Sequence, residues 1–89
     1  MKYFDWDEDK NKWLIANRGI SFEMIIEYVT NEEVVIILNN HPPYEHQRVY
    51  MINIDNYMYE IPIVEDDQKI FLNTIYPSSK ATKKYLNDK

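Results

Sequence analysis

The sequence predicts one α+β domain, built from two N-terminal helices, a four-stranded antiparallel sheet and a C-terminal helix. Three observations predict this fold class. Apolar residues recur at helical spacing in residues 5–33, short strand-like runs follow, and a capped segment with helical character comes after Pro77. A length of 89 residues suits a single domain, so residues 1–89 are treated as one unit.

The segment "DWDEDKNKWLIANRG" is typical of a helix. Asp5 is expected to cap its N-terminus, and the acidic residues that follow suit the helix dipole. Trp6, Trp13 and Leu14 form an apolar stripe. Gly19 is expected to end this helix.

The segment "SFEMIIEYVTNEE" predicts a second helix with one buried face. Ser21 is a suitable N-cap for it. Phe22, Ile25, Ile26 and Val29 follow at positions i, i+3, i+4 and i+7. The same residues would also fit a strand, but the cap favours the helix.

Four later runs predict the strands, and their sequences are VVIILNN, RVYMINI, YMYEIPIV and KIFLNTIY. The first is continuously apolar, which predicts a buried strand. Asp55–Asn56 is compatible with a tight hairpin between the second and third. Pro62 requires a bulge or an edge in its strand. After Pro77, "SSKATKKYL" predicts a helix capped by Ser78 or Ser79.

The composition excludes several function classes. The chain is 45% apolar, which is too high for a disordered segment, and no run approaches the roughly 18 residues of a membrane span. Its acidic start differs from a signal peptide, so a cytoplasmic location is expected. The absence of cysteine excludes disulfides and thiolate metal sites, and one glycine leaves no phosphate-cradling loop. We therefore expect no metal and no cofactor.

The loop "HPPYEHQR" gathers polar residues that could carry chemistry. His41, Glu45 and His46 do not match the spacing of a compact metal site, so a histidine acting as acid or base is the better functional interpretation. A solvated surface loop remains the simpler alternative. Arg48 is expected to share a strand face with Tyr50, where it could bind a phosphate or form a surface ion pair.

Two further groups have both a functional and a structural interpretation. Glu60 lies within a strand, as a buried base or as a solvent-facing residue. Four tyrosines could stack on nucleobases or could simply favour strands, and they are Tyr50, Tyr57, Tyr59 and Tyr76.

Positive charge gathers at the C-terminal end of an acidic chain whose net charge is −5. Lys80 and Lys84 are one helical turn apart, with Lys83 beside them. The lysines could bind a phosphate, or they could complement the helix dipole. The net charge argues against nonspecific adhesion to nucleic acid but leaves room for a local basic site.

The opening residues "FDWDEDKNKWLIANRGISFEMIIEYV" resemble the N-terminal signature of the BrnT family of toxins. In that family an aromatic residue, an acidic residue and Trp–Asp precede a helix, and a Gly–hydrophobic–Ser–Phe–Glu turn starts the next. The loop that ends in Arg48 and the closing "SSKATKKYL" also fit the family's shape. The matching residues are Phe4, Asp5, Trp6, Asp7, Lys10, Gly19, Ile20, Ser21, Phe22 and Glu23.

The resemblance implies a RelE-like fold and the toxin of a type II toxin–antitoxin pair, a ribonuclease that cleaves RNA without metal. It also implies a cognate antitoxin that neutralises the toxin in a hetero-oligomer. On this interpretation, Arg48 and Lys80 would stabilise charge on the phosphorane, and His46 or Tyr76 would transfer protons. Lys83 and Lys84 would bind RNA.

The chain also departs from the family pattern. Ser79 stands where the resemblance leads us to expect an arginine, and Asn17–Arg18–Gly19 replaces Lys–His–Gly. Typical members are basic. The loss of an arginine fork predicts weakened or absent activity.

Two alternatives to an enzyme follow from the same residues. The first is a non-catalytic partner-binding module of the same fold. The second is an acidic nucleic-acid mimic, which is disfavoured because the carboxylates are scattered. An enzyme needs Arg48 and Lys80 in one cleft, whereas a binding module needs an exposed apolar or aromatic patch.

Overall fold

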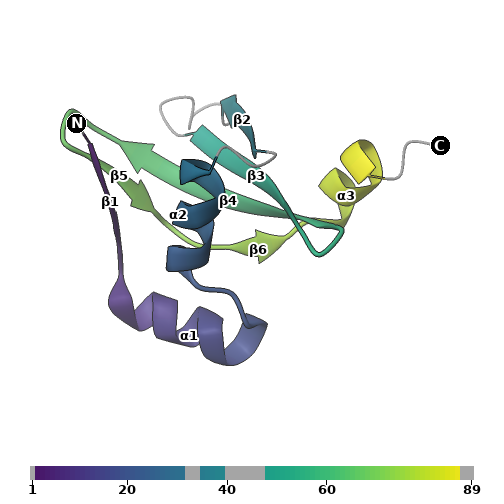
Figure 1. The fold of residues 1–89 in the computed structure, drawn as a ribbon, viewed down its shortest axis with the longest axis horizontal. Helices are drawn as coiled ribbons and strands as arrows, with labels where there is room; N and C mark the ends of the chain where they lie inside the picture. The colour runs from purple at the N-terminus through teal and green to yellow at the C-terminus, as the bar shows by residue number, and fades with distance from the viewer. Residues whose placement is uncertain (1, 32–34, 40–47, 87–89) are drawn as a thin grey trace.

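A computed structural model of the chain describes residues 2–31, 35–39 and 48–86 (Figure 1). Within these residues, three helices accompany one mixed sheet, so the predicted α+β class is confirmed. None of the described helices is long and apolar enough to cross a membrane. The elements in chain order are β1 (Tyr3–Trp6), α1 (Glu8–Arg18), α2 (Phe22–Thr30), β2 (Val35–Asn39), β3 (Arg48–Ile54), β4 (Tyr57–Glu65), β5 (Lys69–Leu72), β6 (Tyr76–Pro77) and α3 (Ser79–Leu86).

The sheet differs from the predicted four-stranded antiparallel one. Its order is β1-β5-β4-β3-β2, with β6 also paired to β4. β1 runs parallel to β5, and the other strand pairs are antiparallel. The predicted fourth strand is divided into β5 and β6. A four-residue edge strand that pairs with a segment far along the chain leaves no periodic signal of its own, so β1 was not predicted.

The two N-terminal helices begin and end at residues with clear capping geometry. Asp7, rather than the predicted Asp5, caps α1, because its side chain accepts a hydrogen bond of 2.9 Å from the backbone N–H of Asp9. Asp5 belongs to β1 instead. Gly19 ends α1 in the left-handed conformation at φ 67°, as predicted. The predicted cap of α2 by Ser21 is also confirmed.

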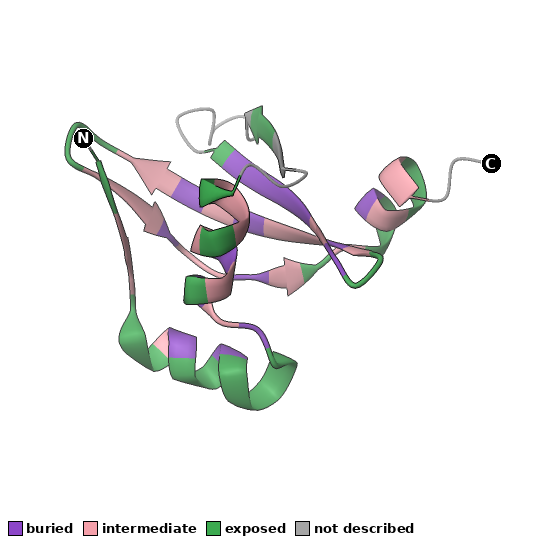
Figure 2. Cartoon of the chain, viewed as in Figure 1, coloured by how far each residue is buried: buried purple, intermediate pink, exposed green. Residues whose placement is uncertain are grey.

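The main core lies between the sheet and the helices α1 and α2 (Figure 2). Phe22 and Ile25 are buried, and Ile26 and Val29 pack against the same cluster, so the predicted face of α2 is confirmed. The fully or almost fully buried members of this core are Leu14, Ile20, Phe22, Ile25, Tyr50, Ile52, Ile54, Ile61, Ile63, Leu72 and Ile75.

A second, smaller core attaches α3 to the sheet. It contains Val49, Met51, Met58 and Ala81. Because successive side chains of a strand point to opposite faces, the side chain of Met51 lies on the face opposite the main core. The helices α1 and α2 therefore cover one face of the sheet, and α3 packs against part of the other face.

The hairpin between β3 and β4 matches its prediction. Asp55 and Asn56 have φ values of 53° and 69°, which is the pattern of a type I′ turn. Two residues that tolerate the left-handed region therefore join the two longest strands with a continuous register.

Pro62 lies without a bulge at a local edge of β4, because residues 61 and 62 have no described strand partner on the side of β5 and β6. It lies opposite Val49 of β3, and its carbonyl accepts a hydrogen bond of 2.9 Å from the N–H of Asn73. The nitrogen and oxygen of one residue point to the same side of an extended strand, so the proline nitrogen faces the interruption between β5 and β6.

The prediction of a buried strand for β2 is wrong. Ile37 is 54% exposed and Leu38 is 39% exposed. These side chains are exposed because β2 is an edge strand, which comes last in the strand order of the described residues and has β3 on one side only. A continuous apolar run does not distinguish an edge strand from a central one.

Candidate functional site

The candidate site lies on the face of the sheet that carries α3. Glu60 of β4 stands opposite Tyr76 of β6 in the register of the two strands. The Tyr76 hydroxyl donates a hydrogen bond of 3.0 Å to Oε1 of Glu60. Both side chains are half-buried. Glu60 follows Met58 by two residues and so shares the face on which Met58 contacts α3.

The start of α3 is held against β4, and α3 directly follows β6, the strand that contains Tyr76 (Figure 1). After Pro77, the N–H of Ser78 donates a hydrogen bond of 2.9 Å to the carbonyl of Met58. The Ser78 hydroxyl accepts from the N–H of Ala81 at 3.1 Å, so Ser78 acts as the predicted cap. The Thr82 hydroxyl donates to the Ser78 carbonyl and accepts from the N–H of Met58. Two of these hydrogen bonds join α3 and its cap to Met58 of β4, and the other two hold the first turn of the helix.

The predicted basic residues of α3 are exposed to solvent. Lys80 and Lys83 are exposed, and Lys84 lies with its Nζ 5.4 Å from the ring centroid of Tyr85. Within the described part of the chain, none of these lysines forms an ion pair. Ser79 is the exposed first residue of α3 and precedes Lys80. The structure therefore brings Tyr76, Ser79 and the three lysines to one end of the sheet.

Arg48 lies elsewhere. It shares the face of Tyr50, as predicted, but this face carries the main core. Its Nη1 is 3.8 Å from Oε1 of Glu65, which also pairs with Lys2. Arg48 stands opposite Ile63, which is five residues and about 17 Å along β4 from the attachment of α3 at Met58. The structure thus does not place Arg48 in one cleft with Lys80.

The loop histidines cannot be compared with their prediction. His41, Glu45 and His46 lie outside the described residues. Within the described residues, no group of three potential metal ligands comes together. The proposed role of His46 in proton transfer stays a prediction.

Two tyrosines, Tyr50 and Tyr76, have pKa values raised above the ordinary tyrosine value. Burial raises the pKa of Tyr76, and the hydrogen bond and charge of Glu60 raise it further. The pKa of Tyr50 is also raised by burial first and by Glu65 second, against a smaller opposing effect of Arg48. Tyr76 therefore keeps its proton well into the alkaline range.

These shifts predict a late phase in the alkaline titration. Tyr50 and Tyr76 should ionise above the usual tyrosine pKa of about 10. Since the folded pKa values exceed the unfolded ones, the stability from these two groups falls as pH rises above about 10. Tyrosinate absorbance measures the ionisation. In Glu60→Gln the late phase of Tyr76 should move earlier but persist, because burial is the larger cause. An unchanged titration would contradict the contribution of Glu60.

Glu60 is the residue whose part in the site could not be recognised in the sequence. Its position within a strand was compatible with a buried base or a solvated side chain. The pairing of β6 with β4, which brings Tyr76 to Glu60, depends on the break between β5 and β6. The run "KIFLNTIY" carries no clear sign of that break.

The sequence has no significant match to a protein-family model or to a curated protein. Among solved structures, the chain is similar to the Brucella abortus ribonuclease toxin BrnT, known from a crystal structure at 1.1 Å resolution. The match has a TM-score of 0.63 at 12% identity, and it covers 89% of this chain and 99% of the toxin. At this identity the similarity concerns the fold. The resemblance of the opening residues to the BrnT family is thus confirmed at the level of the fold, and this chain has a BrnT-like fold.

Proposed function

We propose that this chain is the toxin of a type II toxin–antitoxin pair, a metal-independent endoribonuclease that acts in the cytoplasm and is neutralised by an antitoxin. The observation that carries the proposal is the Tyr76–Glu60 hydrogen bond beside the exposed lysines of α3. The shared fold with a ribonuclease toxin supports it. The proposed RNA site lies on the sheet face that carries α3.

The proposed chemistry needs three groups. A base removes the proton of the 2′-hydroxyl, whose oxygen then attacks the adjacent phosphorus. Cations stabilise the phosphorane, and an acid protonates the departing 5′-oxygen as the P–O5′ bond breaks. Glu60 is the proposed base. Tyr76 is the proposed acid, because its hydroxyl carries a proton at neutral pH and lies 3.0 Å from the carboxylate of Glu60.

The lysines of α3 supply the positive charge in this proposal. Lys80 is closest in sequence to Tyr76 and is assigned to the phosphorane. Lys83 and Lys84 are assigned to neighbouring phosphates of the RNA. Arg48 receives no role in this site, because its guanidinium lies near Glu65 and on the other face of the sheet.

The substitution Ser79→Arg tests the site and is expected to raise RNA cleavage about 10- to 100-fold. Ser79 is exposed beside Lys80, so an arginine fits there and its planar fork can bind two phosphate oxygens. The cation costs about 0.3–1 kcal/mol at a helix N-terminus, which the fold should tolerate. The measurement is cleavage of a labelled RNA in EDTA by the purified chain, freed of any partner.

Thr30→Arg is the matched control for this test. It adds the same charge at an exposed position of α2, away from α3, and should leave cleavage unchanged. An equal gain in both variants would indicate a general effect of charge. If neither the chain nor Ser79→Arg cleaves RNA, with or without ribosomes, the enzyme proposal fails.

A second candidate function is a non-catalytic partner-binding module of the same fold. The exposed apolar side chains of Ile37 and Leu38 on β2 favour it. The separation of Arg48 from Lys80 favours it as well, because the enzyme predicted from the sequence needs both residues in one cleft. Serine at position 79, in place of the expected arginine, is compatible with it. This function becomes the preferred one if the cleavage test fails.

A further inference from the structure

The outer side of β2 is an open sheet edge in the described part of the chain. β2 ends the strand order, and its five residues pair in continuous register with β3 on the inner side. Edge strands usually carry a charge, a proline or a bulge that prevents pairing with another chain. The sequence of β2, VIILN, has no charged residue and no proline. Its outer backbone N–H and C=O groups can therefore accept another strand.

The exposed side chains of β2 indicate which side chains the added strand would carry. Ile37 and Leu38 are adjacent and exposed, so they lie on opposite faces of the sheet. Ile37 shares the face of Tyr50, and Leu38 shares the face of Val49. A strand added at this edge would cover both if it carried apolar side chains on both of its faces.

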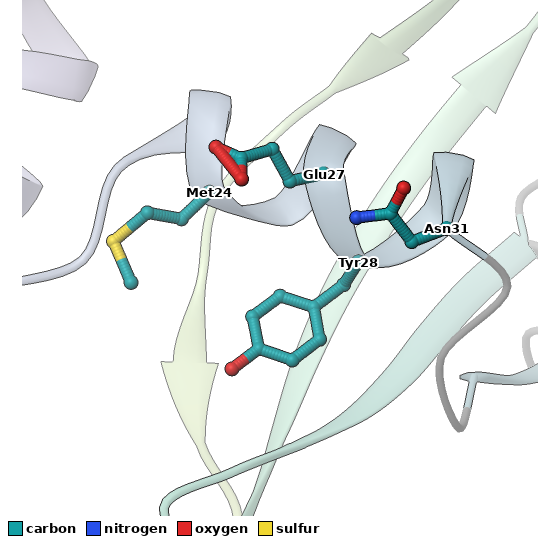
Figure 3. A pocket seen from close by; sticks show the side chains of 4 residues that line it. All are labelled: Met24, Glu27, Tyr28 and Asn31. Carbon is teal, nitrogen blue, oxygen red and sulfur yellow. The ribbon is translucent and has the colours of Figure 1, made fainter.

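A groove with one carboxylate, that of Glu27, lies near one end of this edge. Its lining residues are Met24, Glu27, Tyr28 and Asn31, all on one side of α2 (Figure 3). Asn31 precedes Val35 by four residues, so their Cα atoms are at most about 15 Å apart. In α2 there are two glutamates and no basic residue. A chain that pairs antiparallel to β2 would leave the edge at Val35, toward Glu27.

The negative charge of Glu27 distinguishes between the chains that could pair with the outer edge of β2. A second copy of this chain would bring a net charge of −5, and Asn40, His41, Pro42 and Pro43 follow its own β2. It offers no lysine or arginine there for Glu27. A segment of a basic partner protein offers both the strand and the cation.

We propose that β2 accepts an antiparallel strand from a partner protein, apolar on both faces, whose following lysine or arginine binds Glu27. This interaction surface is separate from the proposed RNA site and does not depend on RNA cleavage. Main-chain hydrogen bonds provide the affinity, and the apolar side chains and the cation provide the specificity.

The test uses the full chain and the blocked synthetic peptide TVIVTRR as the probe. Amide chemical shifts are followed by NMR as the peptide concentration rises to about 1 mM. The expected result is saturable shifts confined to residues 35–39 and to the α2 groove. TVIVTEE should bind more weakly than TVIVTRR, by more than the loss of the Glu27 ion pair alone, because its glutamates repel Glu27. No binding is expected for TVIVTRR with alternate backbone nitrogens methylated, because methylation removes the ladder donors.

Variants then separate the two parts of the proposal. Glu27→Gln should weaken binding of TVIVTRR about two- to fivefold, and the exposed Asp9→Asn should not change it. Ile37→Lys should abolish binding, and a well-dispersed spectrum would show that this variant is folded.

Failure of TVIVTRR to bind would overturn the proposal. Shifts located at α3, or self-association through β2 without peptide, would overturn it as well. RNA cleavage by the same sample reports independently on the proposed function.

Discussion

Replacing Tyr76 with phenylalanine is expected to lower RNA cleavage in EDTA by about 10²- to 10⁴-fold, the range of a general acid or base. The substitution removes the hydroxyl that donates to Glu60 at 3.0 Å and keeps the ring that is half-buried on β6. The loss should therefore appear in the rate constant of cleavage under single-turnover conditions. RNA binding should change little, because the phosphate contacts are assigned to α3.

Tyr57→Phe is the matched control for this experiment. Tyr57 lies on the opposite face of β4, where its ring packs edge-on against Tyr59 at a centroid distance of 5.9 Å. It should cleave RNA at the rate of the unsubstituted chain. A Tyr76→Phe protein that is folded and fully active would remove Tyr76 from the proposed mechanism. Glu60→Gln should be impaired to a similar degree, since it removes the proposed base.

The substitution Asn11→Leu is expected to lower the free energy of unfolding by about 2–4 kcal/mol. Asn11 is 2% exposed, and its Oδ1 accepts a hydrogen bond of 2.8 Å from the N–H of Phe22. Its Nδ2 donates to Glu23 at 2.9 Å and to Glu8 at 3.3 Å. Leucine is of similar size but leaves the buried N–H of Phe22 without an acceptor. Urea denaturation at neutral pH gives the difference.

Asn17→Leu is the control, because Asn17 is exposed and its side chain bonds the carbonyl of Trp13. Its free energy of unfolding should change by less than about 0.5 kcal/mol.

The hydrogen bond from Asn11 is also the largest cause that lowers the pKa of Glu23. A lowered folded pKa gives stability above the unfolded pKa that is lost on acidification. Asn11→Leu should weaken this acid dependence, and equal losses in both asparagine variants would contradict the buried role.

The elements that were predicted from the sequence have local signals. The second helix has a cap and a periodic face, and the hairpin has Asp55–Asn56 between two strands. The C-terminal helix has its serine cap. β1 and β6 have no such signal, because each exists through pairing with a strand distant in sequence. Tertiary position decides the exposure of Ile37 in the same way.

The residues of the candidate site also fall into two groups, those placed by their sequence neighbours and those placed by tertiary structure. Ser79 and the lysines of α3 are close because they are neighbours in sequence. The distance between Arg48 and Lys80 depends on which face of the sheet carries which helix. Alternation correctly placed Arg48 on the face of Tyr50, but it could not show that α1 and α2 cover this face. Sequence periodicity thus groups residues on a face and leaves the neighbours of that face undetermined.

The parallel pairing of β1 with β5 has a consequence for synthesis of the protein. Trp6 of β1 stands opposite Leu72, so during synthesis β1 has no partner until β5 has been made. Phe4 and Trp6 pack against the main core, which therefore also remains incomplete until β5 has been made. Contacts between such distant segments form late in folding. Any premature termination product that ends before β5 lacks a closed sheet, and it also lacks Tyr76 and α3.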